Sequence, residues 1–295
     1  MIIARICWQL LVVLLCAVIS LVSSYLLPAP EQGKPISGEE YVTPTPSPEP
    51  SEPSEPDERE LPDLTYILHA GGVTPEGVAG SNSLEALDWS YEQGYRVMEL
   101  DFSWTADGEL ACVHDWDRYD AYLVEGEVPT LAEFDARRST AYGYTAMTME
   151  HVAQWMEEHP DTWIVPDVKG KTVEALALIA WRYPDLQDRF IPQIYHTEEY
   201  EPVLALGYPD VFLTVYQMPL EERTDAAALA AFAEDHPLVG ISIPTDLLRE
   251  PGYLDGLFTA GVPIYTHTVN GWESQQLVFS MGLTGMFTDA GPAVE

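Results

Sequence analysis

The sequence predicts an α/β fold, a (β/α)8 TIM barrel, over residues 61–295. Short apolar runs alternate there with amphipathic stretches such as SLEALDWSYEQG, TVEALALIAWRY and DAAALAAFAEDH. Strands that alternate with helices form parallel βαβ units, and eight such units in a segment of this length match a barrel, which typically takes about 250 residues. We expect the eight strands at residues 65–70, 97–102, 163–168, 190–195, 211–216, 239–244, 262–269 and 285–289.

A short additional strand interrupts this alternation after the second predicted strand. The run ELACVH, which ends at His114, follows the strand at 97–102 after little more than the turn TADG. A parallel neighbour requires a crossover of about a dozen residues or more, whereas a short Asp-Gly turn makes an antiparallel hairpin. We therefore expect a β-hairpin at the barrel rim that brings His114 back opposite Asp101.

The chain begins with an apolar segment that has no counterpart in the barrel. Residues 6–27 contain no charged side chain, and as a helix this length spans a bilayer core of about 30 Å. Arg5 precedes the segment, which favours an N-terminus in the cytoplasm. A cleaved secretory signal is the alternative, although its apolar region is usually shorter. We interpret residues 1–27 as a transmembrane anchor or signal segment.

A segment without large apolar runs joins this anchor to the barrel. Residues 28–60 are rich in proline, glutamate and serine, so they cannot bury a core, and we interpret them as a disordered linker. The barrel domain of residues 61–295 is then expected outside the cell membrane, held by a single-pass anchor. It is expected to be secreted if the N-terminal segment is cleaved.

The charge of the chain restricts its partners. The formal net charge is −35, with 48 acidic and 13 basic residues, so binding to nucleic acid through basic patches is not expected. An anionic substrate would need a local source of positive charge, such as a bound cation. Cys112 is the only cysteine after residue 16, which predicts neither an internal disulfide nor a thiolate zinc site in the barrel.

Two carboxylates lie at the end of the second predicted strand. Glu99 and Asp101 are two residues apart, so their side chains point to the same side of the strand. Active sites of barrel enzymes lie at the C-terminal ends of the strands, and hard oxygen ligands suit Mg²⁺ or Ca²⁺. The alternative is one inward carboxylate and one that is bonded to backbone.

The first and third predicted strands end in further polar residues. His69 ends the first strand, and a barrel places it beside the strand of Glu99 and Asp101. Asp167 ends the third strand as a possible third carboxylate of a cation site, and Lys169 is suited to neutralise a phosphate or a transition-state oxygen. A plain ion pair between Asp167 and Lys169 at the rim is the alternative.

The ordered motifs of residues 65–290 resemble those of the glycerophosphodiester phosphodiesterases, a TIM-barrel family related in fold to phosphatidylinositol-specific phospholipases C. The motifs are HAGG, SNSLEAL, MELDFSWTADGELACVHD, PDVK, YTHTVN and GMFTD. The resemblance implies that His69 and His114 are the general acid and base. It implies that one divalent cation is held by three carboxylates, which are Glu99, Asp101 and Asp167. It also implies that Lys169 contacts the phosphate and that Asn82 and Glu85 support the site.

Three positions depart from the family pattern. Ala70 stands where the family has a phosphate-binding arginine, Asp167 where it usually has glutamate, and His267 where it has tryptophan. Loss of the bidentate arginine weakens recognition of a phosphate. We assign substrate binding to Lys169, Asn82 and His267.

These residues predict a phosphoric diester hydrolase. The expected reaction is metal-dependent hydrolysis of an extracytoplasmic glycerophosphodiester to an alcohol and glycerol phosphate, with one Mg²⁺ or Ca²⁺ as cofactor. The substrate is expected to be a small-molecule or lipid-derived phosphodiester. The alternatives are a phospholipase of the C or D type that acts on lipid, and a non-catalytic barrel module of the cell envelope that binds a ligand.

Overall fold

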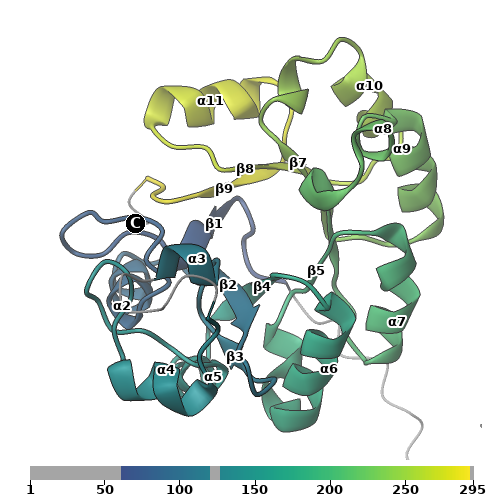
Figure 1. Ribbon diagram of the computed structural model, residues 1–295. Helices are drawn as coiled ribbons and strands as arrows, with labels where there is room; N and C mark the ends of the chain where they lie inside the picture. The colour runs from purple at the N-terminus through teal and green to yellow at the C-terminus, as the bar shows by residue number, and fades with distance from the viewer. Residues whose placement is uncertain (1–60, 120–126, 293–295) are drawn as a thin grey trace, which may run out of the picture. The chain divides into compact units, whose positions relative to one another are not determined.

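The computed structural model describes residues 61–119 and 127–292 (Figure 1). The predicted anchor at residues 1–27 and the predicted linker at 28–60 lie outside these residues, so both stay predictions. Within the two described segments, no helix is both long enough and apolar enough to cross a bilayer.

The barrel is built from eight parallel strands, as the sequence predicts. Their order is β4-β2-β1-β9-β8-β7-β6-β5, and an isolated bridge between Ile164 and Phe190 joins β4 to the segment before β5. The Ile191 amide donates to the Ile164 carbonyl at 2.9 Å across this closure. The strands are β1 (Tyr66–Leu68), β2 (Val97–Trp104), β4 (Trp163–Val168), β5 (Gln193–Ile194), β6 (Phe212–Thr214), β7 (Gly240–Pro244), β8 (Ile264–His267) and β9 (Gly285–Thr288).

Helices surround the strands (Figure 1). Side-chain caps fix where several of them begin: Ser83 accepts from the Ala86 amide, and Thr130 and Thr148 each form a reciprocal capping box. The helices are α2 (Leu84–Glu92), α3 (Trp116–Tyr119), α4 (Leu131–Arg137), α5 (Met149–Glu158), α6 (Thr172–Arg182), α7 (Tyr200–Ala205), α8 (Leu220–Arg223), α9 (Ala226–Asp235), α10 (Tyr253–Phe258) and α11 (Trp272–Ser280).

The predicted hairpin is present at the rim. Strand β3 (Leu110–Ala111) pairs antiparallel with β2, with Trp104 opposite Leu110. Gly108 in the turn has a φ of +81°, a conformation that glycine adopts without steric cost. The hairpin returns the chain to the barrel, and the Ser103 hydroxyl donates to the His114 carbonyl at 3.3 Å.

The two faces of β2 separate the core from the site. Met98, Leu100 and Phe102 belong to the large apolar cluster that includes residues of the surrounding helices. Val97 belongs instead to a small apolar cluster with Ile67, Val165, Ile191, Phe212, Tyr265 and Phe287, all from barrel strands or the segments before them. Because side chains alternate along a strand, Glu99 and Asp101 share the face of Val97 and lie beyond this inner cluster, towards the C-terminal end.

Candidate active site

Three carboxylates gather at the C-terminal end of the barrel. Oxygen atoms of Glu99, Asp101 and Asp167 lie within 4.8 Å of one another. The register of the sheet explains this, because Asp101 of β2 is the direct parallel partner of Asp167 of β4. The structure thus brings together the three residues that the sequence predicts as metal ligands.

Asp101 and Asp167 share the ammonium group of Lys169. Its Nζ lies 2.6 Å from Asp101 Oδ1 and 2.8 Å from Asp167 Oδ2. Burial disfavours the charged form of Asp101, but Lys169 and the amide of Asn82 outweigh it and hold the pKa of Asp101 below its usual range. The predicted Asp167–Lys169 ion pair therefore exists, but it forms part of the carboxylate cluster.

Glu99 is the carboxylate with an unsatisfied oxygen. Its side chain is 2% exposed, and Oε2 accepts from the Ala70 amide at 2.8 Å, while Oε1 has no hydrogen-bond partner among the described residues. Burial and the neighbouring charge of Asp101 raise the pKa of Glu99 to about 8. A buried polar atom without a partner is costly, and a cation held by the three carboxylates would satisfy it. The donor set therefore fits a hard divalent cation such as Mg²⁺ or Ca²⁺.

His69 is held by a carboxylate that sequence reasoning missed. Its Nδ1 lies 2.6 Å from Asp289 Oδ1, and Asn270 bonds the other Asp289 oxygen and accepts from the Asp289 amide at 2.9 Å. Burial lowers the pKa of His69, but the hydrogen bond to Asp289 and the charges of Glu99 and Asp101 prevail and raise it to about 9. His69 is therefore an oriented imidazole that favours its protonated form.

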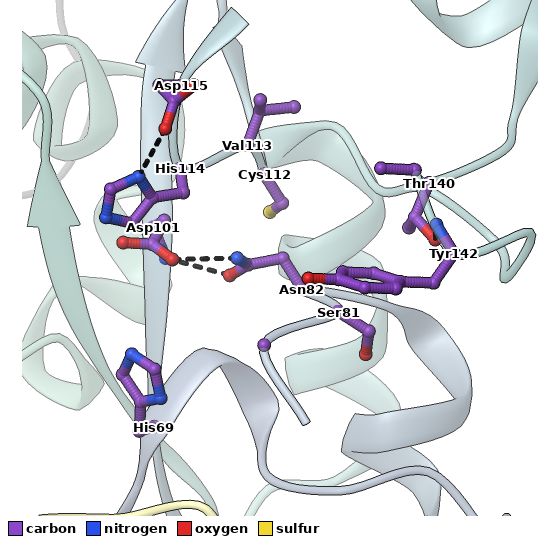
Figure 2. A pocket seen from close by; sticks show the side chains of 12 residues that line it. His69, Ser81, Asn82, Asp101, Cys112, Val113, His114, Asp115, Thr140 and Tyr142 are labelled. Carbon is purple, nitrogen blue, oxygen red and sulfur yellow. Dashed lines mark hydrogen bonds and ion pairs between the residues drawn. The ribbon is translucent and has the colours of Figure 1, made fainter. Parts of the chain in front are cut away.

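His114 is held in a similar way, but nearer the solvent. Its Nδ1 lies 2.8 Å from Asp115 Oδ2, and its side chain is 51% exposed. Figure 2 shows His69 and His114 on the same side of a pocket, with Asp101 between them. Because both rings use Nδ1 for a carboxylate, each has its Nε2 available for a substrate.

Asn82, Glu85 and His267, which the sequence predicts to support the site or bind substrate, each have a different hydrogen-bond partner. Asn82 holds Asp101, since its Nδ2 donates to Asp101 Oδ2 at 2.7 Å and its Oδ1 accepts from the Asp101 amide at 3.0 Å. Glu85 accepts from the amide and hydroxyl of Thr145. His267 Nδ1 lies 3.0 Å from the Ser242 hydroxyl, and burial lowers the pKa of His267 to about 4. His267 is therefore neutral near pH 7.

Two tyrosines that sequence reasoning missed contact Asp167. The Tyr195 hydroxyl donates to Asp167 Oδ1, and the Tyr216 hydroxyl lies 3.3 Å from both oxygens of that carboxylate. Tyr195 directly follows β5 and Tyr216 follows β6 by two residues. The rule that places active sites at the C-terminal ends of barrel strands could have identified both tyrosines, and Asp289 after β9 as well.

Two pockets meet at the histidines. Both are lined by His69, Asp101 and His114. The central pocket has a volume of about 210 Å³ and also contains Glu99, Asp167, Lys169, Gln193, Tyr216 and His267. The rim pocket has a volume of about 250 Å³ and also contains Ser81, Asn82, Cys112, Asp115, Thr140 and Tyr142 (Figure 2).

Solved structures of similar fold come from several bacteria. A glycerophosphodiester phosphodiesterase from Parabacteroides distasonis matches with a TM-score of 0.60 and 17% identity, over 77% of this chain and 93% of that chain. One from Thermotoga maritima matches with a TM-score of 0.59 and 17% identity, over 78% and 96%. A phosphodiesterase from Oleispira antarctica, solved in complex with the product sn-glycerol-3-phosphate, matches with a TM-score of 0.57 and 18% identity, over 77% and 93%. At these identities the similarity establishes the fold.

The sequence itself establishes the family. No curated protein matches the chain. Residues 69–291, which run from the first histidine to the end of the last strand and just beyond, match the Glycerophosphoryl diester phosphodiesterase family. This confirms the resemblance seen in the motifs. The chain belongs to the glycerophosphoryl diester phosphodiesterase family and is a phosphoric diester hydrolase.

Proposed function

We propose that the chain hydrolyses a glycerophosphodiester to an alcohol and glycerol phosphate, with one divalent cation and the His69–His114 pair. The observation that carries the proposal is the carboxylate cluster, in which Glu99 Oε1 has no partner among the residues that the structure describes, and beside which both imidazoles line the same two pockets. The Oleispira antarctica phosphodiesterase bound to sn-glycerol-3-phosphate supports glycerol phosphate as the product.

The three carboxylates would hold the cation, which supplies positive charge to the non-bridging phosphoryl oxygens when it is bound. Lys169 adds positive charge, and it is the only lysine or arginine among the described residues that line the two pockets. The family arginine is replaced by Ala70, whose backbone amide is bonded to Glu99. Lys169 thus provides positive side-chain charge for the phosphate, a function that the family arginine would otherwise share.

The two histidines move the protons. A water oxygen forms the new bond to phosphorus, and one imidazole takes its proton. The bond from phosphorus to the alcohol oxygen breaks, and the other imidazole, protonated at the start, gives its proton to that oxygen. Asp289 and Asp115 orient the rings at Nδ1, which leaves Nε2 for both transfers.

The test is hydrolysis of glycerophosphocholine by the purified full-length chain with Mg²⁺ or Ca²⁺, followed as released glycerol phosphate. We expect activity that is lost with EDTA and falls by about 10²- to 10⁴-fold in His69→Ala and in His114→Ala. Undiminished hydrolysis in both variants would contradict the acid–base assignment. A panel of diesters without turnover, together with a ligand that raises the melting temperature, would favour the non-catalytic binding module.

The location of the reaction is part of the proposal. The uncharged segment of residues 6–27, the basic residue before it and the linker at 28–60 support a barrel held outside the cell membrane. Protease added to intact cells should digest the barrel. A barrel that is degraded only after lysis would contradict this location.

A further inference from the structure

The two pockets suggest how a diester divides between them, and this inference rests on the proposed function. A phosphodiester has two alcohol arms on one phosphorus. His69 and His114 line both pockets, so the phosphorus must lie where the pockets meet if both imidazoles are to reach its oxygens. One arm then extends into the central pocket and the other into the rim pocket.

The central pocket suits the glycerol arm. Besides the charged residues, it is lined by Gln193, Thr214, Tyr216 and His267, whose amide, hydroxyl and imidazole groups are able to bond the hydroxyls of a polyol. His267 is neutral near pH 7, because burial lowers its pKa to about 4. The other arm, which leaves as the alcohol, is then in the rim pocket.

The charge of the rim pocket favours a cation. Its described lining residues include the carboxylates of Asp101 and Asp115, no lysine or arginine, and the protonated His69, which offsets one of the two negative charges. The whole chain carries 48 acidic against 13 basic residues, so the surrounding field has the same sign. A negatively charged arm would be repelled, whereas a positively charged arm would be attracted.

Tyr142 provides an aromatic wall opposite the histidines. Figure 2 shows Thr140 and Tyr142 on one side of the rim pocket and His69, Asp101 and His114 on the other. Tyr142 is 58% exposed as a residue, so its side chain is accessible to a ligand. A cation over an aromatic face is attracted by the ring quadrupole, which is how quaternary ammonium groups are commonly recognised.

A hydrogen-bonded turn holds the backbone that carries this ring. The buried Thr140 Oγ1 accepts from the amides of Tyr142 at 3.3 Å and Tyr144 at 3.1 Å. The Tyr144 hydroxyl in turn bonds Glu76 and Thr74, at 3.1 Å each, on the loop that follows β1. The turn therefore sets the backbone position of Tyr142 beside the pocket.

We propose that the rim pocket binds the leaving alcohol, that it prefers a positively charged amino alcohol such as choline, and that the Tyr142 ring contributes to this preference. Two substrates that differ only in charge test this proposal. They are glycerophosphocholine and its carbon isostere, in which the neutral 3,3-dimethylbutyl group replaces choline.

The measurement is kcat/KM of the full-length chain for both substrates in the wild type and in two variants. We expect the wild type to prefer the choline diester by between about 3-fold and about 30-fold. Tyr142→Ala should lower this ratio by about 3-fold, because the loss on the choline diester should exceed the loss on the neutral diester, and the part of the preference that is due to Asp101 and Asp115 should remain. Tyr142→Phe, which keeps the ring and removes the hydroxyl, should retain the preference.

The outcomes separate this inference from the proposed function. Equal turnover of the two diesters by the wild type would overturn the charge preference and leave the hydrolysis proposal intact. A preference that Tyr142→Ala leaves undiminished would overturn the role of Tyr142. Failure to cleave either diester, or any other of a broad panel, would remove the proposed function and this inference with it.

Discussion

The two halves of the barrel differ in the side chains that they bring to the site. The ends of β1, β2 and β4 supply the charged half, which we define as His69, Glu99, Asp101, Asp167 and Lys169. The opposite strands, β5 to β8, supply the neutral half, which we define as Tyr195, Tyr216, Ser242 and His267. The two halves therefore have different functions. The charged half provides the charged groups for the phosphate, and the neutral half provides uncharged hydrogen-bonding groups.

The shifted pKa values of the site residues keep the neutral half uncharged near pH 7 and Lys169 of the charged half protonated. Burial lowers the pKa of His267 to about 4 and raises the pKa of Tyr216 to about 12, so both stay uncharged. The ammonium of Lys169, in contrast, is surrounded by the carboxylates of Asp167 and Asp101, which overcome its burial and raise its pKa. Substitutions in the charged half should therefore affect kcat most, and those in the neutral half should mainly affect KM.

The largest effect is expected for the carboxylates. Glu99→Gln keeps the size of the side chain but removes a carboxyl group that can ionise to bind a cation, and we expect kcat to fall on the order of 10³-fold. The measurement is kcat at saturating Mg²⁺ or Ca²⁺. Glu133→Gln is the matched control, because Glu133 lies in the exposed capping box of α4 and should leave kcat unchanged. Equal activity of the two variants would contradict a catalytic role for the charged half.

A smaller effect is expected for Asp289, which contacts His69 and is not among the residues that line the two pockets. The Asp289 carboxylate stabilises the protonated imidazole, so Asp289→Asn should lower the pKa of His69 from about 9 towards its ordinary value of 6.5. The limb of the pH–rate profile that belongs to His69 should then move to lower pH by about one unit or more.

The control for this prediction is another carboxylate. Asp161 is a partly exposed side chain that pairs with Arg96, and Asp161→Asn should not move the profile. If Asp289→Asn lowers kcat without moving either limb, Asp289 has a structural role and does not set the pKa of His69.

The smallest effect is expected in the neutral half. His267→Gln keeps a neutral hydrogen-bonding group beside Ser242, and we expect KM to rise by less than about 10-fold while kcat changes by less than about 3-fold. A fall in kcat as large as that of His69→Ala would show that His267 takes part in the proton transfers, and the distinction between the two halves would fail.

The sequence predicted the features that depend on the local pattern of apolar and polar residues, which are the strands and the face on which each side chain lies. The apolar runs identify all eight strands, and the period of two along β2 correctly places Glu99 and Asp101 on one face. Lengths were less accurate: the run at 190–195 contains Pro192, which has no amide to donate, and only Gln193–Ile194 forms β5. The run at 262–269 likewise shortens to Ile264–His267.

The partners of the site residues depend on distant contacts, which one sequence does not reveal. His69 and Asp289 are 220 positions apart, and they meet because β1 pairs with β9 as the barrel closes. Tyr142 lies in a loop without strand or helix periodicity, so no pattern indicated that its ring would border a pocket. The predicted roles of Asn82 and His267 in substrate binding stay predictions, although the structure uses Asn82 to hold Asp101.

Binding of the cation itself tests the central claim most directly. Titration calorimetry of the full-length chain with Mg²⁺ and with Ca²⁺, in wild type, Glu99→Gln and Glu133→Gln, measures it without any substrate. We predict one cation per wild-type chain, the same stoichiometry in Glu133→Gln, and binding that is weakened by about 100-fold or more in Glu99→Gln. A wild-type chain that binds neither ion, or binding that Glu99→Gln leaves unchanged, would contradict a metal centre formed by Glu99, Asp101 and Asp167.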